Sequence, residues 1–505
     1  MITSPDSAAC PESAVAIATS VRVRRLTAAE VLAAHRARHA ATHPQLNALI
    51  QVRAAAEVDA LGVDDVGHGS LAGVPVSVKE CFPVAGLRTT LGIESRRHVV
   101  DAADAPLVTS LKSAGAVIVG KANVPQAMYL HETDNPVWGR TNHPLVPDRG
   151  PGGSSGGDAA LVAAGVVPLA VGNDLAGSLR QPAHACGIAA LMPRSAALGD
   201  GGAFDTMPHL TVVRPRAGFL AGSVADLVLA AMATSVPVPG CEAVAGGHGL
   251  RIGWWDDTGS VPASPAVIRG VAEAVTRLRA AGATVVPLDP AIAVEAAWLH
   301  LSILAADGGR QIRTLFGGSR PIPGVARLLR IAALPRPVRP LMASVARIAG
   351  RRLEAEAVAK TGPRDAAEVM ALAAARLDLA SRFAALVAAC DAVVCPVSAL
   401  PALRHGTAAR LILAAAPCLL ANLLDLAAGA VPVTTVRPDE ETGRPPSRDP
   451  VLRAAAATDR GSRGLPIGVQ VIATPTRDEA TVLRVMRLIE AAGSTCKTAA
   501  RTASV

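Results

Sequence analysis

Three residues of this chain combine reactive chemistry with suitable surroundings, and the first is Lys79. It ends the run "GVPVSVK", whose β-branched residues predict a buried strand. A lysine withdrawn from water at such a strand end loses hydration, which lowers its pKa and lets it act as a neutral general base. The alternative is a strand-end lysine whose ammonium group reaches solvent.

The second residue is Ser178, in the turn "GNDLAGSLRQPA" at residues 172–183. A serine after a small, turn-prone run and before a predicted helix is positioned like an activated nucleophile. The backbone N–H groups of Leu175, Ala176 and Gly177, with that of the serine itself, could converge on a developing oxyanion. The alternative is an ordinary capped turn in which the serine hydroxyl bonds to backbone.

Two residues of opposite charge flank this turn, Asp174 before it and Arg180 after it. As an ion pair they would hold the turn in place. As solvated surface groups they would contribute little energy. The local sequence is compatible with both.

The third residue lies in the stretch "GGSSGG", residues 152–157. A phosphate-binding P-loop would end in Gly-Lys-Ser/Thr, whereas Asp158 follows here, so a phosphate site is disfavoured. A flexible linker is not expected between two strongly apolar segments. We therefore interpret the stretch as a tight turn with exposed hydroxyl groups.

No Ser-His-Asp set accompanies these residues. His131, His143 and His184 are close in sequence but carry no recognisable motif, and we interpret each as a structural or surface residue. A nucleophilic serine still needs a base, and a lysine that acts through a second serine would supply one.

The elements that must position these residues alternate between strands and helices. Residues 27–60 predict helices, with Thr27 as the N-cap and Glu30 placed for a capping box. "SLKSAGAVIVGKAN" and "DAALVAAGVVPLAVG" each predict a helix end, a turn and a strand, and residues 265–289 repeat this order. This alternation predicts an α/β fold with a mixed or parallel sheet covered by helices. Residues 290–390 are mostly helical, and strands return before a closing helix, "RDEATVLRVMRLIEAAG".

The composition bounds the class of protein. The chain has 505 residues, 50% of them hydrophobic and 2% aromatic, and a formal net charge of +8. Such apolar content predicts a folded globular protein. The basic residues lack the interleaved aromatic residues of nucleic-acid-binding modules, so we expect no nucleic-acid partner. We find no secretory signal and no uninterrupted apolar run of about 20 residues, so we expect a cytoplasmic protein that does not span a membrane.

Together, "GVPVSVKE", "PGGSSGGDAALVAAG" and "GNDLAGSLRQPAHACG" resemble the signature of the amidase-signature family. The resemblance implies that Lys79 is the base and that Ser178 is the nucleophile that accepts the acyl group. Between them, Ser154 would be the bridging serine, joined to Gly153 by a cis peptide bond, whereas Ser155 would serve the loop. The resemblance also implies a large mixed sheet covered by helices on both sides, and chemistry that needs neither metal nor organic cofactor.

Within that family, further stretches are most similar to the fatty acid amide hydrolases, among them "ANVPQAM", "NPVWGRTNHP", "NLLDLAAGAVPVTTV" and "GLPIGVQVIATP". The resemblance implies a single domain over residues 61–505, with residues 1–60 as a helical segment packed on it. It places Met128, with the turn residues already named, at the substrate-binding site and oxyanion hole. It gives Gly153, Ser155 and the Asp174–Arg180 pair structural roles.

The chain also departs from the family pattern. Ala176 stands where the family has the first glycine of the oxyanion turn. If that position needs a conformation open only to glycine, the methyl group would strain the turn, and a catalytically inactive binding protein becomes a hypothesis. Gln181 replaces a more common apolar residue, and "LMPRSAALGDGGAFD" differs from the family along one wall of the expected pocket.

A strongly basic segment lies within the helical insertion at about residues 290–390. Between Asp307 and Glu354 there is no acidic residue. The same span holds ten arginines: Arg310, Arg313, Arg320, Arg327, Arg330, Arg336, Arg339, Arg347, Arg351 and Arg352. Interleaved with apolar residues, they resemble an interfacial segment attracted to anionic lipid. The alternative is a solvated helical face in an Arg-rich protein.

From these observations we expect an amide hydrolase that acts on a small-molecule substrate, a fatty acyl or other lipophilic amide. A general short-chain or aryl amidase is the alternative. The A subunit of a glutamyl-tRNA amidotransferase is a third, and the basic insertion argues against it. A cytoplasmic protein with peripheral contact to anionic membrane, and a homodimer, are both compatible with the sequence.

Overall fold

A single large sheet organises the molecule. The computed structural model describes residues 12–53, 68–208, 210–241, 246–257 and 261–492. Eleven strands form the sheet, in the order β1-β3-β2-β6-β8-β7-β12-β13-β11-β9-β10. Their bounds are β1 Leu49–Val52, β2 Pro75–Lys79, β3 Val117–Ala122, β6 Leu169–Asp174, β7 Ala189–Met192, β8 Arg216–Ala221, β9 Arg251–Trp254, β10 Thr284–Pro287, β11 Ala392–Pro396, β12 Ala428–Thr435 and β13 Pro466–Ala473. Two short strands, β4 Asp134–Asn135 and β5 Gly139–Arg140, form a separate hairpin.

The sheet is mixed, as the alternation of strands and helices predicted. β2 runs parallel to both of its neighbours, β3 and β6. The centre of the sheet is antiparallel, from β6 through β8, β7, β12 and β13 to β11. Because β2 and β6 are adjacent and parallel, their carboxyl ends lie side by side, and Lys79 and Asp174 are the last residues of these two strands.

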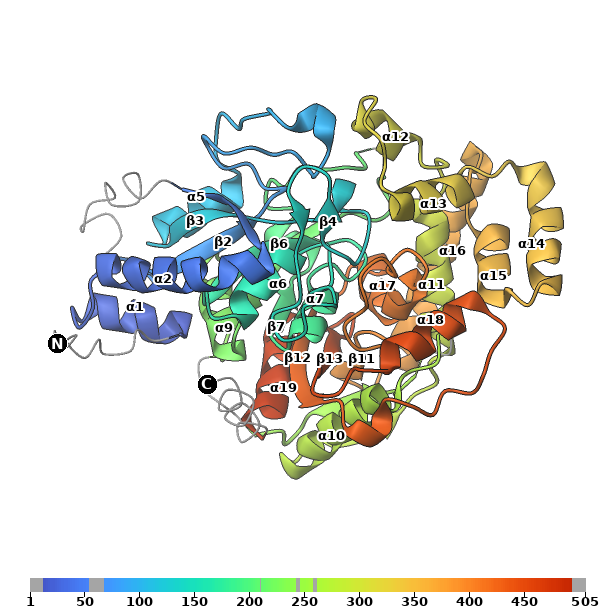
Figure 1. Cartoon of the computed structure of the whole chain (residues 1–505). Coiled ribbons are helices and arrows are strands. Elements are labelled where there is room, and N and C mark those ends of the chain that lie inside the picture. Colours follow the sequence, from blue (N-terminus) through green and yellow to red (C-terminus); the bar gives the residue numbers. More distant parts are fainter. Residues whose placement is uncertain (1–11, 54–67, 209, 242–245, 258–260, 493–505) are drawn as a thin grey trace.

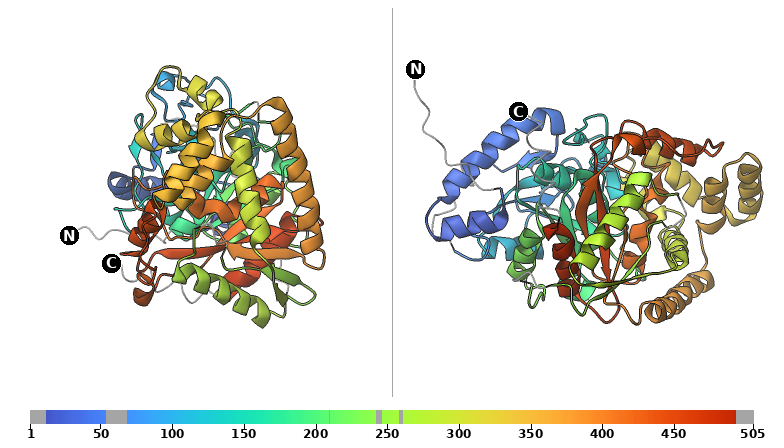
Figure 2. Two further views of the ribbon diagram at one scale, coloured as in Figure 1. Left: turned by 90° about the vertical axis from the view of Figure 1, so that its right-hand side faces the viewer. Right: turned by 90° about the horizontal axis from the view of Figure 1, so that it is seen from below.

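Helices cover both faces of the sheet (Figures 1 and 2). One face packs against α1 Ala14–Arg22, α5 Pro106–Ser113, α9 Val224–Ala233, α10 Pro265–Ala280 and α19 Glu479–Ala491. The other packs against α2 Ala28–Leu46, α6 Gly156–Ala163, α7 Arg180–Cys186, α11 Ala291–Leu304, α16 Ala366–Leu386 and α17 Leu419–Leu423. Alternate residues of a strand point to opposite faces. On β2, Val76 and Val78 join the first core, which directs Ser77 and Lys79 toward the face that α6 covers.

The N-terminal segment is helical and packs on the core, but it also contributes a strand. α2 begins with the predicted capping box, in which Thr27 and Glu30 exchange side-chain to backbone hydrogen bonds. Residues 49–52, expected to be helical, instead form β1, which pairs antiparallel with β3. An unpaired edge of β3 outweighs local helix propensity there, because edge pairing satisfies backbone groups that would otherwise stay open. Residues 1–11 and 54–60 of the predicted segment lie outside the described residues.

The insertion is helical, as predicted, and lies at the opposite end of the molecule from α1 and α2 (Figures 1 and 2). Between α11 and α16 it contains α12 Arg310–Phe316, α13 Pro323–Ala332, α14 Arg339–Ile348 and α15 Arg352–Lys360. Two further α-helices among the described residues are α8 Ser195–Leu198 and α18 Pro450–Asp459. Within the described part of the chain, no helix combines the length and the apolarity needed to cross a bilayer.

Candidate active site

The site is built at the carboxyl ends of β2 and β6, and Lys79 is a fully buried basic group within it. The side chain of Lys79 is 0% exposed, so the surface alternative for this lysine does not hold. Its Nζ lies 2.7 Å from Ser154 Oγ, 2.6 Å from Asn173 Oδ1 and 3.2 Å from Asn173 O. Burial lowers the pKa of Lys79 below its ordinary value, while the charges of Asp158 and Asp174 raise it.

Asn173 orients the lysine amine. Its side-chain and backbone oxygens can only accept hydrogen bonds from Lys79 Nζ. A neutral amine has two hydrogens and one lone pair, so two donations to Asn173 leave the lone pair directed at Ser154 Oγ, 2.7 Å away. This arrangement suits a base that takes a proton from the serine.

The "GGSSGG" stretch is a rigid turn rather than a linker, but Ser154 and Ser155 are buried, so the prediction of exposed hydroxyl groups is wrong. The Gly153–Ser154 peptide bond is cis, as the resemblance implied. A Cβ on Gly153 would lie 2.7 Å from the Leu130 carbonyl oxygen, so only glycine fits this approach. Ser155 N donates to Ser178 O at 3.1 Å, and this bond ties the turn to the segment that carries the predicted nucleophile. Ser155 thus serves the loop, while Ser154 faces the lysine.

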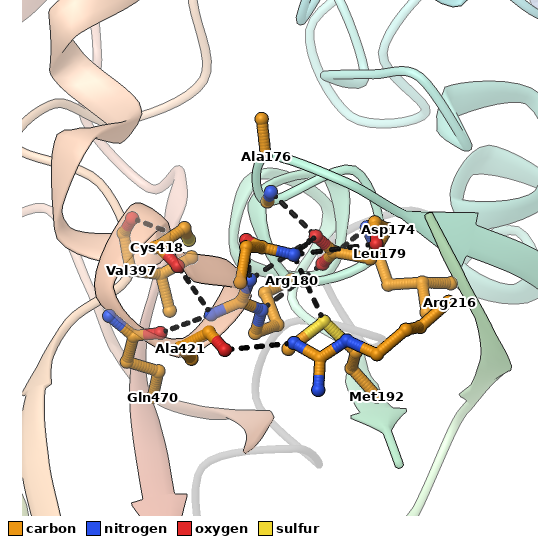
Figure 3. A network of polar contacts seen from close by, with 12 residues as sticks. Asp174, Ala176, Leu179, Arg180, Met192, Arg216, Val397, Cys418, Ala421 and Gln470 are labelled. Carbon is orange, nitrogen blue, oxygen red and sulfur yellow. Dashed lines mark hydrogen bonds and ion pairs between the residues drawn. The ribbon is translucent and has the colours of Figure 1, made fainter. Parts of the chain in front are cut away.

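The turn at residues 174–178 is held by a buried ion pair rather than a surface one. Asp174 and Arg180 are both fully buried, with Arg180 Nε 3.1 Å from Asp174 Oδ2. Burial alone would raise the pKa of Asp174, but the Arg180 guanidinium holds it well below its usual range. Arg180 also donates to Gln470 Oε1 and Cys418 O (Figure 3), and its Nη2 donates to Asn422 Oδ1 and to Asp174 Oδ1. All five guanidinium N–H groups are thereby satisfied, which is what makes a buried pair tolerable.

Asp174 in turn shapes the backbone of the turn. Its carboxylate accepts from Gly177 N at 2.6 Å and from Leu179 N at 3.1 Å. Neither Leu175 N nor Ala176 N donates to another described residue, so these two N–H groups remain available to an oxyanion. Gly177 N–H is held by the carboxylate in this structure, and its role in the oxyanion hole stays a prediction.

Ala176 does not strain the turn. The left-handed conformation falls on Gly177, with φ of 97°, and Ala176 is absent from the residues with positive φ. The methyl group packs beside the small apolar cluster of Ala297, Ala416 and Leu419. The main motive for an inactive binding protein is therefore removed.

His131 contacts the same turn. Its Nε2 lies 3.0 Å from Ala176 O, and burial lowers its pKa to about 4, so it is a neutral donor to that carbonyl at physiological pH. His143 and His184 are also buried and bonded to backbone carbonyls, of Ala185 for the former and of Leu400 and Gly468 for the latter. The three histidines are structural, and none is a surface residue.

An apolar cavity of ≈ 210 Å³ opens onto Ser178. Of the predicted residues, Met128, Leu175 and Ala176 line it with Ser178, while Lys79 and Ser154 are outside its lining. Met128 and its neighbour Ala127 both have φ near 55°, a sparsely populated conformation of the kind found at binding sites. The remaining wall is largely aliphatic, with side chains from α11, α13 and α15. Arg327 and Glu354 form an ion pair at the part of the cavity that the insertion lines.

Sequence reasoning missed Asn173, Asn422 and Gln470. Asn173 could have been found, because it lies near the carboxyl end of a strand adjacent and parallel to β2, where side chains of the two strands converge. Asn422 and Gln470 reach Arg180 from 242 and 290 residues away in the chain, and no local motif marks them.

The fold and this site define an amidase-type hydrolase, in which a buried lysine and a serine in a cis peptide lie beside a second serine at a tight turn. The amidase family model matches residues 30–482. Fatty-acid amide hydrolase 1 of Sus scrofa is 34% identical over 450 residues, covering 84% of this chain and 76% of that protein. The chain belongs to the amidase-signature family, and it is a hydrolase that acts on carbon–nitrogen bonds.

Other members of the family are also similar. The A subunit of glutamyl-tRNA(Gln) amidotransferase from Acidobacterium capsulatum is 30% identical, over 86% of this chain and 88% of that protein. A solved fatty acid amide hydrolase superposes with a TM-score of 0.79 at 21% identity, covering 97% of this chain and 86% of that one. The structural match shows the shared fold, and the choice among these activities depends on the site.

Proposed function

We propose that this protein hydrolyses lipophilic acyl amides, fatty acyl amides among them, through an acyl-enzyme on Ser178. The observation that carries the proposal is the 2.7 Å contact between Lys79 Nζ and Ser154 Oγ beside a serine that faces an aliphatic cavity. Relatives of comparable identity include both a fatty-acid amide hydrolase and an amidotransferase subunit, so the support for the proposal comes from the lining of the cavity.

In the first half of the proposed reaction, Ser178 Oγ attacks the amide carbonyl carbon. Its proton passes to Ser154 Oγ, whose own proton passes to the lone pair of Lys79 Nζ. A carbon–oxygen bond forms, and the carbonyl π electrons move to the oxygen, where Leu175 N–H and Ala176 N–H can donate to the negative charge.

In the second half, the tetrahedral intermediate collapses and the carbon–nitrogen bond breaks. An amine anion is a poor leaving group, so the nitrogen must take the proton back from Lys79 through Ser154 as it departs. Water then attacks the acyl-serine and gives its proton to the same relay, which returns it to Ser178 Oγ as the carboxylic acid leaves.

The cavity favours a lipophilic acyl group over the small polar groups of the alternatives. Side chains such as Leu301, Leu328 and Ile331 give it an aliphatic surface. A glutamine side-chain amide or an acetamide would leave most of this surface uncovered. A longer acyl chain would cover it, and each methylene that it buries contributes about 0.8 kcal/mol to binding. The cavity therefore supports long acyl chains against a short-chain amidase or an amidotransferase subunit.

We expect kcat/KM to rise about 4-fold for each methylene added between acetyl and decanoyl amides of one amine, until the cavity is filled. The measurement is steady-state hydrolysis of such a series, with an aryl amide and glutamine as further substrates. Ile331→Glu should flatten the rise, because it places a charge in the lining. Ile268→Glu, on exposed α10 surface outside the lining, is the matched control and should keep it. A preference for acetamide-sized substrates or for glutamine would reject the lipophilic proposal.

We further propose that the insertion binds anionic membrane through α14. Leu341, Met342, Val345 and Ile348 lie on one side of this helix and are 45–87% exposed. Arg347, also on α14, is exposed and adds positive charge beside this face, whereas exposed Arg352 lies 3.5 Å from Glu356 in an ion pair. Arg327 and Arg336 are also held in ion pairs, with Glu354 for the former and with Asp365 and Glu368 for the latter. The proposal therefore rests on the exposed apolar face rather than on the number of arginines. α13 and α15, which line the cavity, flank α14 in the chain, so a lipid substrate could enter from the bilayer.

The membrane proposal is tested by co-sedimentation with vesicles of phosphatidylcholine alone or with 30% phosphatidylglycerol, roughly one anionic lipid in three. We expect the protein to bind the anionic vesicles. In Leu341→Glu/Ile348→Glu the affinity for these vesicles should fall at least about 10-fold, because two charges replace apolar side chains that would be buried in the bilayer. Leu377→Glu on α16 is the control, since Leu377 is 63% exposed and Leu341 is 67% exposed. Unchanged vesicle binding rejects the proposal. A double variant that instead dissociates a dimer in light scattering assigns the face to a second copy of this chain.

A further inference from the structure

A second carboxylate lies beside the Lys79 relay, and the proposed mechanism does not use it. Asp158, in the first turn of α6, is fully buried. Its Oδ1 accepts from Ser77 Oγ at 2.8 Å. Its Oδ2 is also buried and accepts no hydrogen bond from another described residue. A buried carboxylate with one free oxygen is costly unless a nearby positive charge compensates it.

The fold places this carboxylate next to the lysine. Ser77 and Lys79 are two residues apart on β2, so their side chains share the face that α6 covers. The chain that follows Ser154 turns directly into α6, which puts Ser154 and Asp158 over the same strand. Ser154 contacts Lys79, and Asp158 contacts Ser77 one side-chain position earlier.

The other titratable groups near Lys79 are neutral, paired or held by other partners, as is Glu80, whose carboxyl group is bonded to Thr90 and Leu91. Burial raises the pKa of Cys81 to about 12, so its thiol is neutral. Burial lowers the pKa of His131 to about 4, so its ring is neutral as well. Asp174 is ionised, but its charge is matched by Arg180 at 3.1 Å. Asp158 makes no ion pair within the described residues, so of the two carboxylates whose charges raise the pKa of Lys79 it is the one without a paired cation.

We infer that Asp158 is a positioning residue for the proton relay: its carboxylate, held by Ser77 over β2, supplies the counter-charge that keeps Lys79 basic enough to work in both directions. Burial alone depresses the basicity of Lys79. A lysine made too weakly basic would accept the serine proton poorly in the first half of the reaction. A lysine whose ammonium form is strongly stabilised by a contacting carboxylate would return the proton poorly in the second half. A carboxylate that lies over the same face of β2, and is held by Ser77 rather than by the amine itself, gives an intermediate basicity.

The titration of Asp158 agrees with this role. Burial raises its pKa to about 7, while the Ser77 hydrogen bond and the charge of Lys79 lower it. Each charge shifts the titration of the other group, so we expect the acid limb of the pH profile to belong to the pair.

The test is the pH dependence of kcat/KM on a decanoyl amide for wild type, Asp158→Asn and Ser77→Ala. A base must be neutral to act, so activity falls as pH drops through the pKa of Lys79. Removing the neighbouring negative charge lowers that pKa, so Asp158→Asn should move the acid limb about 1–2 pH units lower while retaining activity on the alkaline side. Ser77→Ala favours the protonated carboxyl group and should shift the limb in the same direction by less.

The matched control is Asp226→Asn. Asp226 is also buried with a raised pKa, but it lies in the first turn of α9 and accepts hydrogen bonds from Ser13 and Ser223, outside the site. Its variant should keep the wild-type limb. A folded, active Asp158→Asn with the wild-type limb, or one inactive at every pH, overturns the inference. If that variant does not fold, an unshifted limb in Ser77→Ala overturns it. The inference rests on the proposed function, but its failure is distinct: full activity without Lys79 would reject the relay itself.

Discussion

Ser178→Ala is expected to lower kcat at least about 10⁴-fold on every amide that the wild type hydrolyses. The variant keeps the lysine, the bridging serine and the cavity, but no atom remains to form the acyl-enzyme. Residual catalysis would come from substrate binding and the oxyanion donors alone. Steady-state rates measure the loss, and intact-protein mass spectrometry of quenched reactions should show an acyl adduct on wild type that is absent from the variant.

Ser110→Ala is the matched control for this prediction. Ser110 is an exposed serine of α5 whose hydroxyl bonds to Pro106 O in its own helix. Its loss should leave both kcat and the acyl adduct unchanged. Retention of full activity by Ser178→Ala would refute the acyl-enzyme mechanism, whatever the substrate proves to be.

The second large effect is expected from Lys79→Ala, which should lower kcat by about 10²–10⁴-fold, the usual contribution of a general base. Wild-type activity should also fall at acid pH. Burial lowers the pKa of Lys79, so the neutral base is populated nearer to neutral pH than for a solvated lysine, and protonation below that pKa removes it. In the alanine variant this acid limb should disappear. The measurement is kcat/KM across pH for both proteins.

Lys112→Ala serves as the control for the lysine prediction. Lys112 is partly exposed and forms an ion pair with Asp104 on the surface, at the end of α5. Such a pair contributes little, so the pH profile should be that of wild type. An acid limb that persists in Lys79→Ala would assign the titrating base to another group.

Much of the fold follows from local pattern, because strand and helix periods are properties of short segments. The β-branched run that ends at Lys79, the Thr27–Glu30 capping box and the closing helix all lie where the sequence predicts them. β1 does not, because its conformation is set by the open edge of β3 rather than by its own residues.

For the site, the sequence by itself determined which side chains are the candidates for the base, the bridging group and the nucleophile. Lys79, Ser154 and Ser178 lie in stretches whose glycines and spacing specify tight turns at strand ends, and such turns depend on local backbone conformation. The sequence also showed that Ala176 could strain the turn. Whether it does depends on which residue of the turn has a positive φ, and only the structure places this on Gly177.

Tertiary structure alone decided the environment of these residues. It buried the Asp174–Arg180 pair and brought Cys418 and Gln470 to it from 238 and 290 residues away. It held Lys79 Nζ between Asn173 and Ser154, and set Asp158 above β2. The order of strands in the sheet creates these contacts, and that order depends on which distant segments pair. No short segment carries that information. The reactive residues could therefore be predicted from the sequence, whereas the pKa shift of Lys79, the cavity at Ser178 and the charge of Asp158 beside the relay could not.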